Sequence, residues 1–301
     1  MKFMLFTLGG RFYWEDVFNY QNWVIQKHCF RNVYRLLDPY DICRESGDFE
    51  QCKETLLQYM KAYEAEALYD DTVILLPGYG RTRNSMLEFA EYLKKLPVNV
   101  VIFNYASLKK DITYHAHMLL QFVTNMQSQS GGNISIINYG AGCLVTRAMI
   151  NASNNFHNYK IVRVLDVNPL NSGSDLAELL ACNRFFQTLL GPMLNDIQTP
   201  NAVKIPKLPQ DVDHGIIFCP TKGLNIIKSL LAKYESFPFS TPPSEDSYAK
   251  NVISVENPTW FPLQNPLLFE YCRNYIENGE FAKIIRQPAK KNKKTSKKFA
   301  K

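Results

Sequence analysis

The sequence predicts an α/β fold with a mostly parallel central sheet and helices on both of its faces. From residue 71 onward, short apolar runs alternate with longer amphipathic segments. Alternation of this kind builds parallel strands that are joined by right-handed crossovers. The chain has 301 residues, of which 46% are apolar, so it can bury a large core. In such a sheet, ligand sites are expected beyond the carboxyl ends of the strands.

The expected elements fall into three regions along the chain. Residues 1–68 are expected to form a helical appendage, because apolar residues cluster in segment 14–25 and segment 49–68 has the spacing of an amphipathic helix. Residues 69–288 are expected to form the α/β domain, and residues 289–301 a lysine-rich disordered tail. Strands are expected at residues 72–76, 99–105, 133–138, 161–167, 215–219 and 251–255, and helices near residues 82–95, 111–126, 141–152, 175–190, 226–232 and 265–278.

The positive net charge comes from one end of the chain. The net charge is +6, and seven lysines lie within the last twelve residues, so the rest of the chain carries −1. A lysine run of this kind is ordinarily a solvated tail, and binding to nucleic acid or an anionic membrane stays open as an alternative. Apart from Phe299 no aromatic residue interrupts the lysines. The tail therefore lacks a surface on which bases could stack.

Cysteine use and hydropathy indicate a soluble protein of the cytoplasm. The seven cysteines are an odd number without a CxxC pair, which favours reduced thiols and gives no support to a zinc site. No apolar run reaches the ~20 residues of a membrane span. The first 16 residues contain a short apolar run but no small-residue cleavage site, so a signal peptide is not expected.

Segment 134–149, ISIINYGAGCLVTRAM, carries the main functional signal. It predicts a buried strand, a sharp turn at Gly140 and a helix that begins directly afterwards. Glycine adopts the strained positive φ of such a turn at little steric cost. An ordinary strand-to-helix connection would explain the glycines equally well.

Several segments resemble the lipase-like α/β-hydrolases. Residues 142–147, GCLVTR, resemble the helix start after the catalytic serine in the family pattern G-x-S-x-G, in which Gly140 holds the serine position and Asn138 the first glycine position. Residues 75–82 resemble the family's oxyanion loop, residues 168–177 the turn after its sixth strand, and residues 9–14 and 34–39 the leading segment of a bacterial group. The resemblance implies a three-layer α/β-hydrolase fold.

The resemblance also implies which residues form the site. The amides of Tyr79 and Ala141 correspond to the two oxyanion donors, and Tyr139 and Trp260 would line the pocket. In the family's last motif, Pro258 stands at the position of the catalytic histidine, and by spacing Glu235 stands near that of the acid. Residues 191–213, with four prolines, lie where the family often has a lid, although a proline-rich connector is the simpler interpretation.

Loss of both serine and histidine implies loss of ordinary serine-hydrolase catalysis, because the triad acts as a unit. The first hypothesis is a pseudoenzyme that binds an acyl or small apolar ligand or a protein partner, with no cofactor and no metal. The second is an ester hydrolase with a displaced nucleophile at Ser85, Ser172 or Cys143. The third is a basic-tailed adaptor for nucleic acid or membrane. No histidine is well placed as a general base; the five are His28, His115, His117, His157 and His214.

Overall fold

A computed structural model describes residues 10–62, 68–153, 156–219, 249, 251–255 and 262–281. Its central feature is a six-stranded sheet in the order β10-β9-β8-β7-β5-β6. Every neighbouring pair of strands is parallel, as predicted. The strands are β5 (Thr72–Leu76), β6 (Asn99–Ile102), β7 (Ile134–Tyr139), β8 (Ile161–Val167), β9 (Asp213–Phe218) and β10 (Asn251–Ser254).

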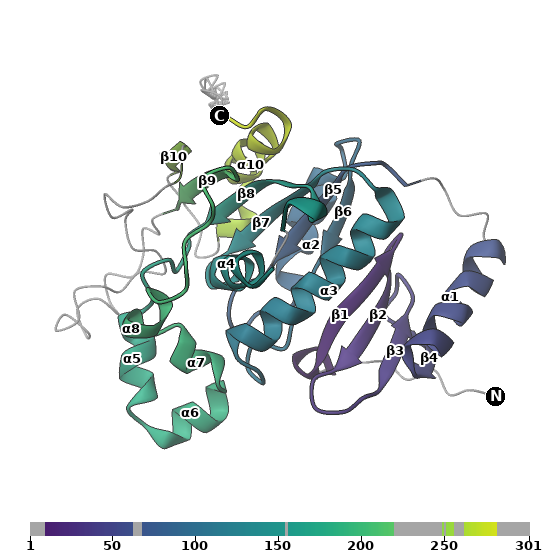
Figure 1. The fold of residues 1–301 in the computed structure, drawn as a ribbon, viewed down its shortest axis with the longest axis horizontal. Coiled ribbons are helices and arrows are strands. Elements are labelled where there is room, and N and C mark those ends of the chain that lie inside the picture. Colours follow the sequence, from purple (N-terminus) through teal and green to yellow (C-terminus); the bar gives the residue numbers. More distant parts are fainter. Residues whose placement is uncertain are drawn as a thin grey trace, which may run out of the picture.

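Helices cover both faces of this sheet (Figure 1). On one face, α3 (Ile112–Ser130) and α4 (Gly142–Ala152) pack against side chains such as Leu76 and Ile136. On the other face, α2 (Leu87–Leu93) and α10 (Pro266–Asn278) pack against Val73 and Leu75. Successive strand residues point to opposite faces, so strands that are buried on both sides are mostly apolar, with exceptions such as Asn138 and Asp166. The three-layer α/β class predicted from the sequence is confirmed.

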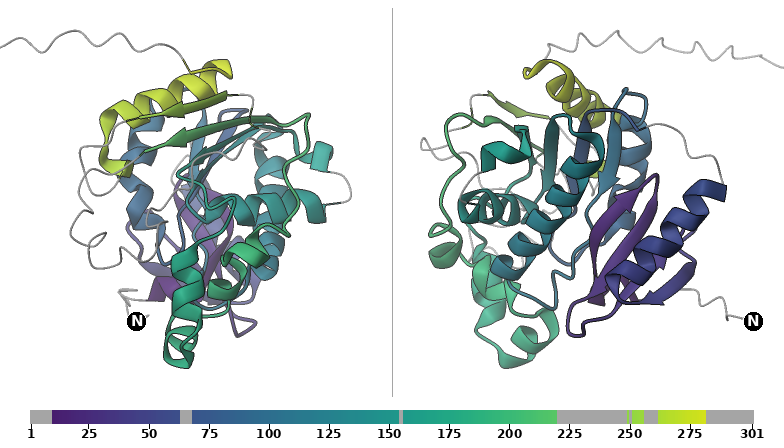
Figure 2. Two further views of the ribbon diagram at one scale, coloured as in Figure 1. Left: turned by 90° about the vertical axis from the view of Figure 1, so that its left-hand side faces the viewer. Right: turned by 45° about the vertical axis from the view of Figure 1, so that its right-hand side comes forward.

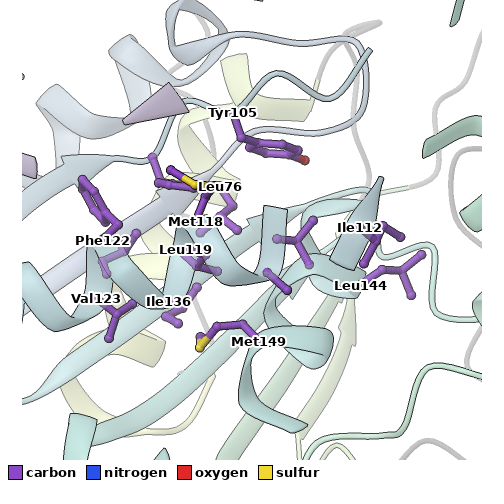
Figure 3. Close-up of a cluster of buried hydrophobic side chains, with 14 of the residues drawn as sticks. Leu76, Tyr105, Ile112, Met118, Leu119, Phe122, Val123, Ile136, Leu144 and Met149 are labelled. Carbon is purple, nitrogen blue, oxygen red and sulfur yellow. The ribbon is translucent and has the colours of Figure 1, made fainter. Parts of the chain in front are cut away.

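The core between the sheet, α3 and α4 is apolar and closely packed (Figure 3). Helical spacing places Leu119, Phe122 and Val123 on one side of α3, where each is fully buried. Met149 of α4 belongs to the same cluster and is also fully buried. Among the described residues, no helix is both long and apolar enough to cross a membrane.

The N-terminal region is a sheet, which corrects the expected helical appendage (Figure 2). Its four antiparallel strands follow the order β1-β2-β3-β4: β1 (Trp14–Tyr20), β2 (Trp23–His28), β3 (Tyr34–Leu37) and β4 (Cys43–Gly47). The expected helix in segment 14–25 is wrong, because Gln21 and Asn22 have φ values of 46° and 69° and turn the chain into a hairpin. The predicted later helix is present as α1 (Phe49–Ala62), which covers β3 and β4.

Strand β1 joins this N-terminal sheet to the α/β core. The amide of Asp16 donates to the carbonyl of Asn104 at 2.9 Å, and the amide of Asn104 donates to Oδ2 of Asp16 at 2.9 Å. Oε1 of Glu15 accepts the amide of Ala106 at 3.1 Å, and Nδ2 of Asn125 donates to the carbonyl of Val17 at 2.6 Å. The two carboxylates are fully buried at this junction.

Residues 168–212 leave the sheet after β8 and return at β9. The predicted helix 175–190 is instead two helices, α5 (Asp175–Ala181) and α6 (Arg184–Leu190). The break occurs because Asn183 is extended and its side chain caps α6, accepting the amide of Phe185 at 2.8 Å. Two short helices follow, α7 (Met193–Asp196) and α8 (Thr199–Ala202), and all four project from one end of the molecule (Figure 1). We name residues 175–202 the cap segment.

The shorter helical turns complete the described secondary structure. They are η1 (Gly10–Tyr13), η2 (Arg83–Met86), η3 (Phe156–Tyr159) and η4 (Pro262–Gln264). The expected helix 226–232 and the lysine-rich tail lie outside the described residues.

Candidate functional site

The turn after β7 has the geometry that the sequence predicts. Gly140 has a φ of +55°, and the next residue but one begins α4. A Cβ added to Gly140 would meet only the Cα of Gly78, at 3.9 Å, which is ordinary contact. The space at Gly140 therefore accepts a Cβ, although a side chain at this φ strains the backbone.

The neighbouring Gly142 is required for a different reason. A Cβ there would lie 3.1 Å from Cβ of Leu76, 3.3 Å from the Leu76 carbonyl oxygen and 3.4 Å from that of Pro77. The start of α4 thus packs directly on the end of β5. This close approach brings the turn at Gly140 beside the loop that follows β5.

The loop after β5 is held by bonds to two other parts of the chain, the loop after β6 and the end of α6. The hydroxyl of Tyr105 donates to the carbonyl of Pro77 at 2.7 Å, and the amide of Gly80 donates to Oγ of Ser107 at 3.0 Å. The hydroxyl of Tyr79 donates to the carbonyl of Leu190, at the end of α6, at 2.5 Å. Tyr79 therefore ties the loop to the cap segment, a contact that the sequence did not reveal.

The two predicted oxyanion donors lie on either side of this contact between turn and loop. Ala141 follows Gly140 directly, and Tyr79 follows Gly78, whose Cα faces Gly140. Within the described part of the chain, neither backbone amide donates a hydrogen bond. Unpaired amides near a helix start favour an anionic or carbonyl oxygen.

Tyr139 lies beneath the loop. Its exposed fraction is 7%, and the Arg81 guanidinium lies 5.6 Å from the centre of its ring. A Cβ on Gly78 would come within 3.0 Å of the ring, so glycine is needed for the loop to cross it. Burial raises the pKa of the Tyr139 phenol to about 12. Tyr139 is thus a neutral support for the loop.

A buried polar chain below the turn was not predicted. Nδ2 of Asn138 donates to Oδ1 of Asp166 at 2.8 Å, and Oδ1 of Asn138 accepts the hydroxyl of Thr146 at 2.7 Å. Nε2 of His214 lies 2.9 Å from Oδ2 of Asp166. The chain spans β7, β8 and β9 and ends on α4. It fixes Asn138, which stands where the hydrolase pattern has its first glycine.

The alternative nucleophiles have different surroundings. Cys143 is 1% exposed, and burial raises the pKa of its thiol well above the usual range. A thiol in this state packs as a small apolar group, as predicted. The hydroxyl of Ser85 donates to the carbonyl of Thr82 at 2.8 Å within its own turn. Ser172 is half-buried in the loop after β8. Glu235, Pro258 and Trp260 lie outside the described residues.

All five histidines lie in described segments. His115 contacts the loop beside Gly140 indirectly, because its ring centre lies 4.9 Å from that of Tyr105, whose hydroxyl bonds to Pro77. Nδ1 of His115 is 2.5 Å from Oε1 of Glu15, and its Nε2 is 3.1 Å from the carbonyl oxygen of Lys110. Nδ1 of His157 is 3.4 Å from Oδ2 of the exposed Asp211. His214 is the second residue of β9, at the amino end of the sheet. Across the described residues, no group of histidine, cysteine and carboxylate side chains could hold a metal ion.

Comparisons with known proteins agree with this architecture. No family model and no curated protein sequence match the chain. Among solved structures, the mature lipase BlEst2 from Bacillus licheniformis superposes with a TM-score of 0.54 and 14% identity, over 68% of this chain and 90% of the lipase. The propeptide form of the same lipase gives a TM-score of 0.54 and 13% identity, over 74% of this chain and 53% of the propeptide form. Phospholipase PlaB from Legionella pneumophila gives a TM-score of 0.43 and 18% identity, over 50% of this chain and 38% of the phospholipase. The chain therefore has the lipase- and esterase-like α/β-hydrolase fold.

Proposed function

We propose that this α/β-hydrolase-fold protein has lost serine-hydrolase catalysis and binds an acyl ligand through the amides of Tyr79 and Ala141. The observation that carries the proposal is the turn at Gly140, which keeps its positive φ and has room for a Cβ but has no nucleophile. The two amides stay available beside it among the described residues. A ligand carboxylate or carbonyl oxygen is the group that such donors recognise.

The positions of the histidines support the loss of catalysis. A general base has to lie within about 3 Å of the proton that it removes. Among the described residues, the carboxylates that face histidines are Glu15, Asp166 and Asp211, and none of these three pairs includes a residue of the turn at Gly140. Without a base, a hydroxyl at the turn would stay a weak nucleophile.

Ala141→Pro tests the binding proposal. Ala141 has a φ of −68°, which proline adopts, and the substitution removes its N–H. Because Ala141 is buried and proline also restricts the backbone of Gly140, circular dichroism and urea unfolding verify that the variant folds. Octanoate binding to the full chain is measured by calorimetry. We expect at least fivefold weaker binding in Ala141→Pro and unchanged binding in Ala141→Ser, which keeps the amide. Equal binding by all three proteins would contradict the proposed amide site.

The second candidate, a hydrolase with a displaced nucleophile, has one observation in its favour: Ser172 is half-buried in the loop at the carboxyl end of β8. A fluorophosphonate probe and p-nitrophenyl esters distinguish it from the pseudoenzyme. We expect neither labelling nor saturable turnover by the full chain. Labelling that Ser172→Ala abolishes would replace the pseudoenzyme proposal with this one.

A further inference from the structure

A cluster of aromatic rings lies on the surface where the N-terminal sheet meets the α/β core. Tyr13 ends η1, His28 ends β2, and Phe30 lies in the turn that follows. The ring centres are 6.2 Å apart for Tyr13 and His28, 6.5 Å for Tyr13 and Phe30, and 6.3 Å for His28 and Phe30. Tyr13 is 41% exposed and Phe30 is 58% exposed. Large rings gathered at the surface in this way are candidates for contact with a partner.

Two lysines from a distant part of the chain border these rings. Nζ of Lys109 lies 4.8 Å from the centre of the Tyr13 ring, and Nζ of Lys110 lies 4.6 Å from that of Phe30. Both lysines belong to the loop between β6 and α3. We name Tyr13, His28, Phe30, Lys109 and Lys110 the aromatic-lysine patch.

The acidic groups near the patch are already engaged. Asp111 follows Lys110 and caps α3, accepting the amide of Tyr114 at 2.8 Å. Glu15 is fully buried and faces His115. Burial, and then the charges of Arg31 and Arg35, lower the pKa of His28. At neutral pH the patch therefore combines three uncharged rings with positively charged lysines.

Exposed rings beside cations match the chemistry of a single-stranded nucleic acid. Each base offers a flat face for stacking, and each phosphate carries a charge that lysine can neutralise. A duplex has the phosphates but keeps its base faces covered. A membrane-binding surface commonly uses the apolar face of an amphipathic helix, whereas the patch is built from a helical turn, a strand end and two loops.

We propose that the aromatic-lysine patch binds single-stranded nucleic acid, with bases stacked on Tyr13 and Phe30 and phosphates beside Lys109 and Lys110. The site is distinct from the proposed acyl site. The lysine-rich terminus would add attraction that does not depend on base stacking. The patch supplies the stacking surface that the terminal lysines lack.

The test is fluorescence anisotropy with labelled 12-nucleotide uridylate and thymidylate strands, measured with the full chain. Stacking contributes about 1 to 3 kcal/mol for each base, so we expect Y13A/F30A to bind at least tenfold more weakly. Y13F/F30Y keeps both rings and should bind like the unchanged protein. Tyr40→Ala, at a ring that is 81% exposed outside the patch, is the matched control and should also have no effect.

The lysines are tested through the salt dependence of binding. With single strands, the slope of log affinity against log salt should fall by about 0.7 for each phosphate that a lysine no longer neutralises. We expect K109Q/K110Q to reduce this slope by about 0.7 to 1.4, which corresponds to one or two phosphates. Circular dichroism and urea unfolding verify that each variant folds.

Three results would overturn the proposal. The first is equal binding by Y13A/F30A, which would leave the lysine-rich terminus as the source of affinity. The second is binding to a duplex of the same sequence as tight as to the single strand. The third is binding to phosphatidylserine vesicles that Y13A/F30A abolishes while oligonucleotide binding persists, which would assign the patch to membranes.

Discussion

At the scale of single residues, the turn at Gly140 allows a direct test of catalytic loss. Gly140→Ser adds a Cβ that makes only an ordinary contact with Gly78, but at a φ of +55° any side chain strains the backbone by about 1 to 3 kcal/mol. We expect the variant to fold with a lower free energy of unfolding and to remain inactive towards p-nitrophenyl esters, because among the described residues no histidine forms a hydrogen bond with the turn. Gly140→Ala is the control for strain. Saturable turnover by the serine variant alone would show that a base is within reach after all.

Local features of single residues could be predicted from the sequence, whereas contacts between side chains of different strands could not. The positive φ of Gly140 and the burial of Cys143 were predicted, because each follows from the local order of strand, turn and helix. The bonds from Asn138 to Asp166 and from Asp166 to His214 were not. They depend on the register that sets Asn138 opposite Asp166 in neighbouring strands. A polar residue in an apolar run shows that a partner is needed but does not identify it.

At the scale of elements, the parallel strands were the most predictable part of the fold. β5 and β8 have the predicted bounds. β5 is buried along its whole length and is apolar after Thr72, whereas β8 keeps its apolar character despite Arg163 and Asp166. The N-terminal hairpin was mistaken for a helix because Trp14, Val17 and Phe18 also fit helical spacing. The turn at Gln21 and Asn22 makes this segment a hairpin. Its positive φ values cannot be predicted from the pattern of apolar residues.

The segment that returns from the cap segment to β9 depends on one side chain of α4. Nε of Arg147 donates to the carbonyl of Pro206 at 3.0 Å, Nη1 donates to Oδ1 of Asn171 at 3.2 Å, and Nη2 donates to the carbonyl of Ile205. Arg147 is 5% exposed, so its loss leaves buried carbonyl groups without a donor. We expect Arg147→Met to lower the free energy of unfolding by about 2 to 4 kcal/mol.

The measurement is urea unfolding together with hydrogen exchange over residues 203–208. Exchange should increase there first, because the arginine holds this segment against α4. Arg184→Met removes an exposed arginine at the start of α6 and serves as the control. Unchanged exchange in Arg147→Met would mean that packing alone holds the segment.

At the scale of the whole molecule, the junction between the N-terminal sheet and the α/β core makes stability depend on pH. Burial raises the pKa of Asp16 from 3.8 to about 6, although Arg83, Arg35, the amide of Asn104 and Gln26 favour the charged form. Folding therefore favours the protonated carboxyl relative to the unfolded chain, although the carboxylate predominates above about pH 6. Its contribution to stability is complete below the unfolded pKa and is lost as the pH rises through the folded one.

Asp16 should therefore make the folded protein less stable as the pH rises. A rise in the pKa from 3.8 to about 6 corresponds to about 3 kcal/mol, so the free energy of unfolding should fall by an amount of that order, from this group alone, between about pH 4 and pH 6. Asp16→Asn cannot titrate, and other carboxyl groups contribute equally to both proteins. The difference between the two profiles of unfolding free energy against pH therefore isolates the titration of Asp16. This holds even if the asparagine side chain bonds less well to Gln26 and lowers stability equally at every pH. Parallel profiles across this range would show that Asp16 keeps its ordinary pKa and does not make stability depend on pH.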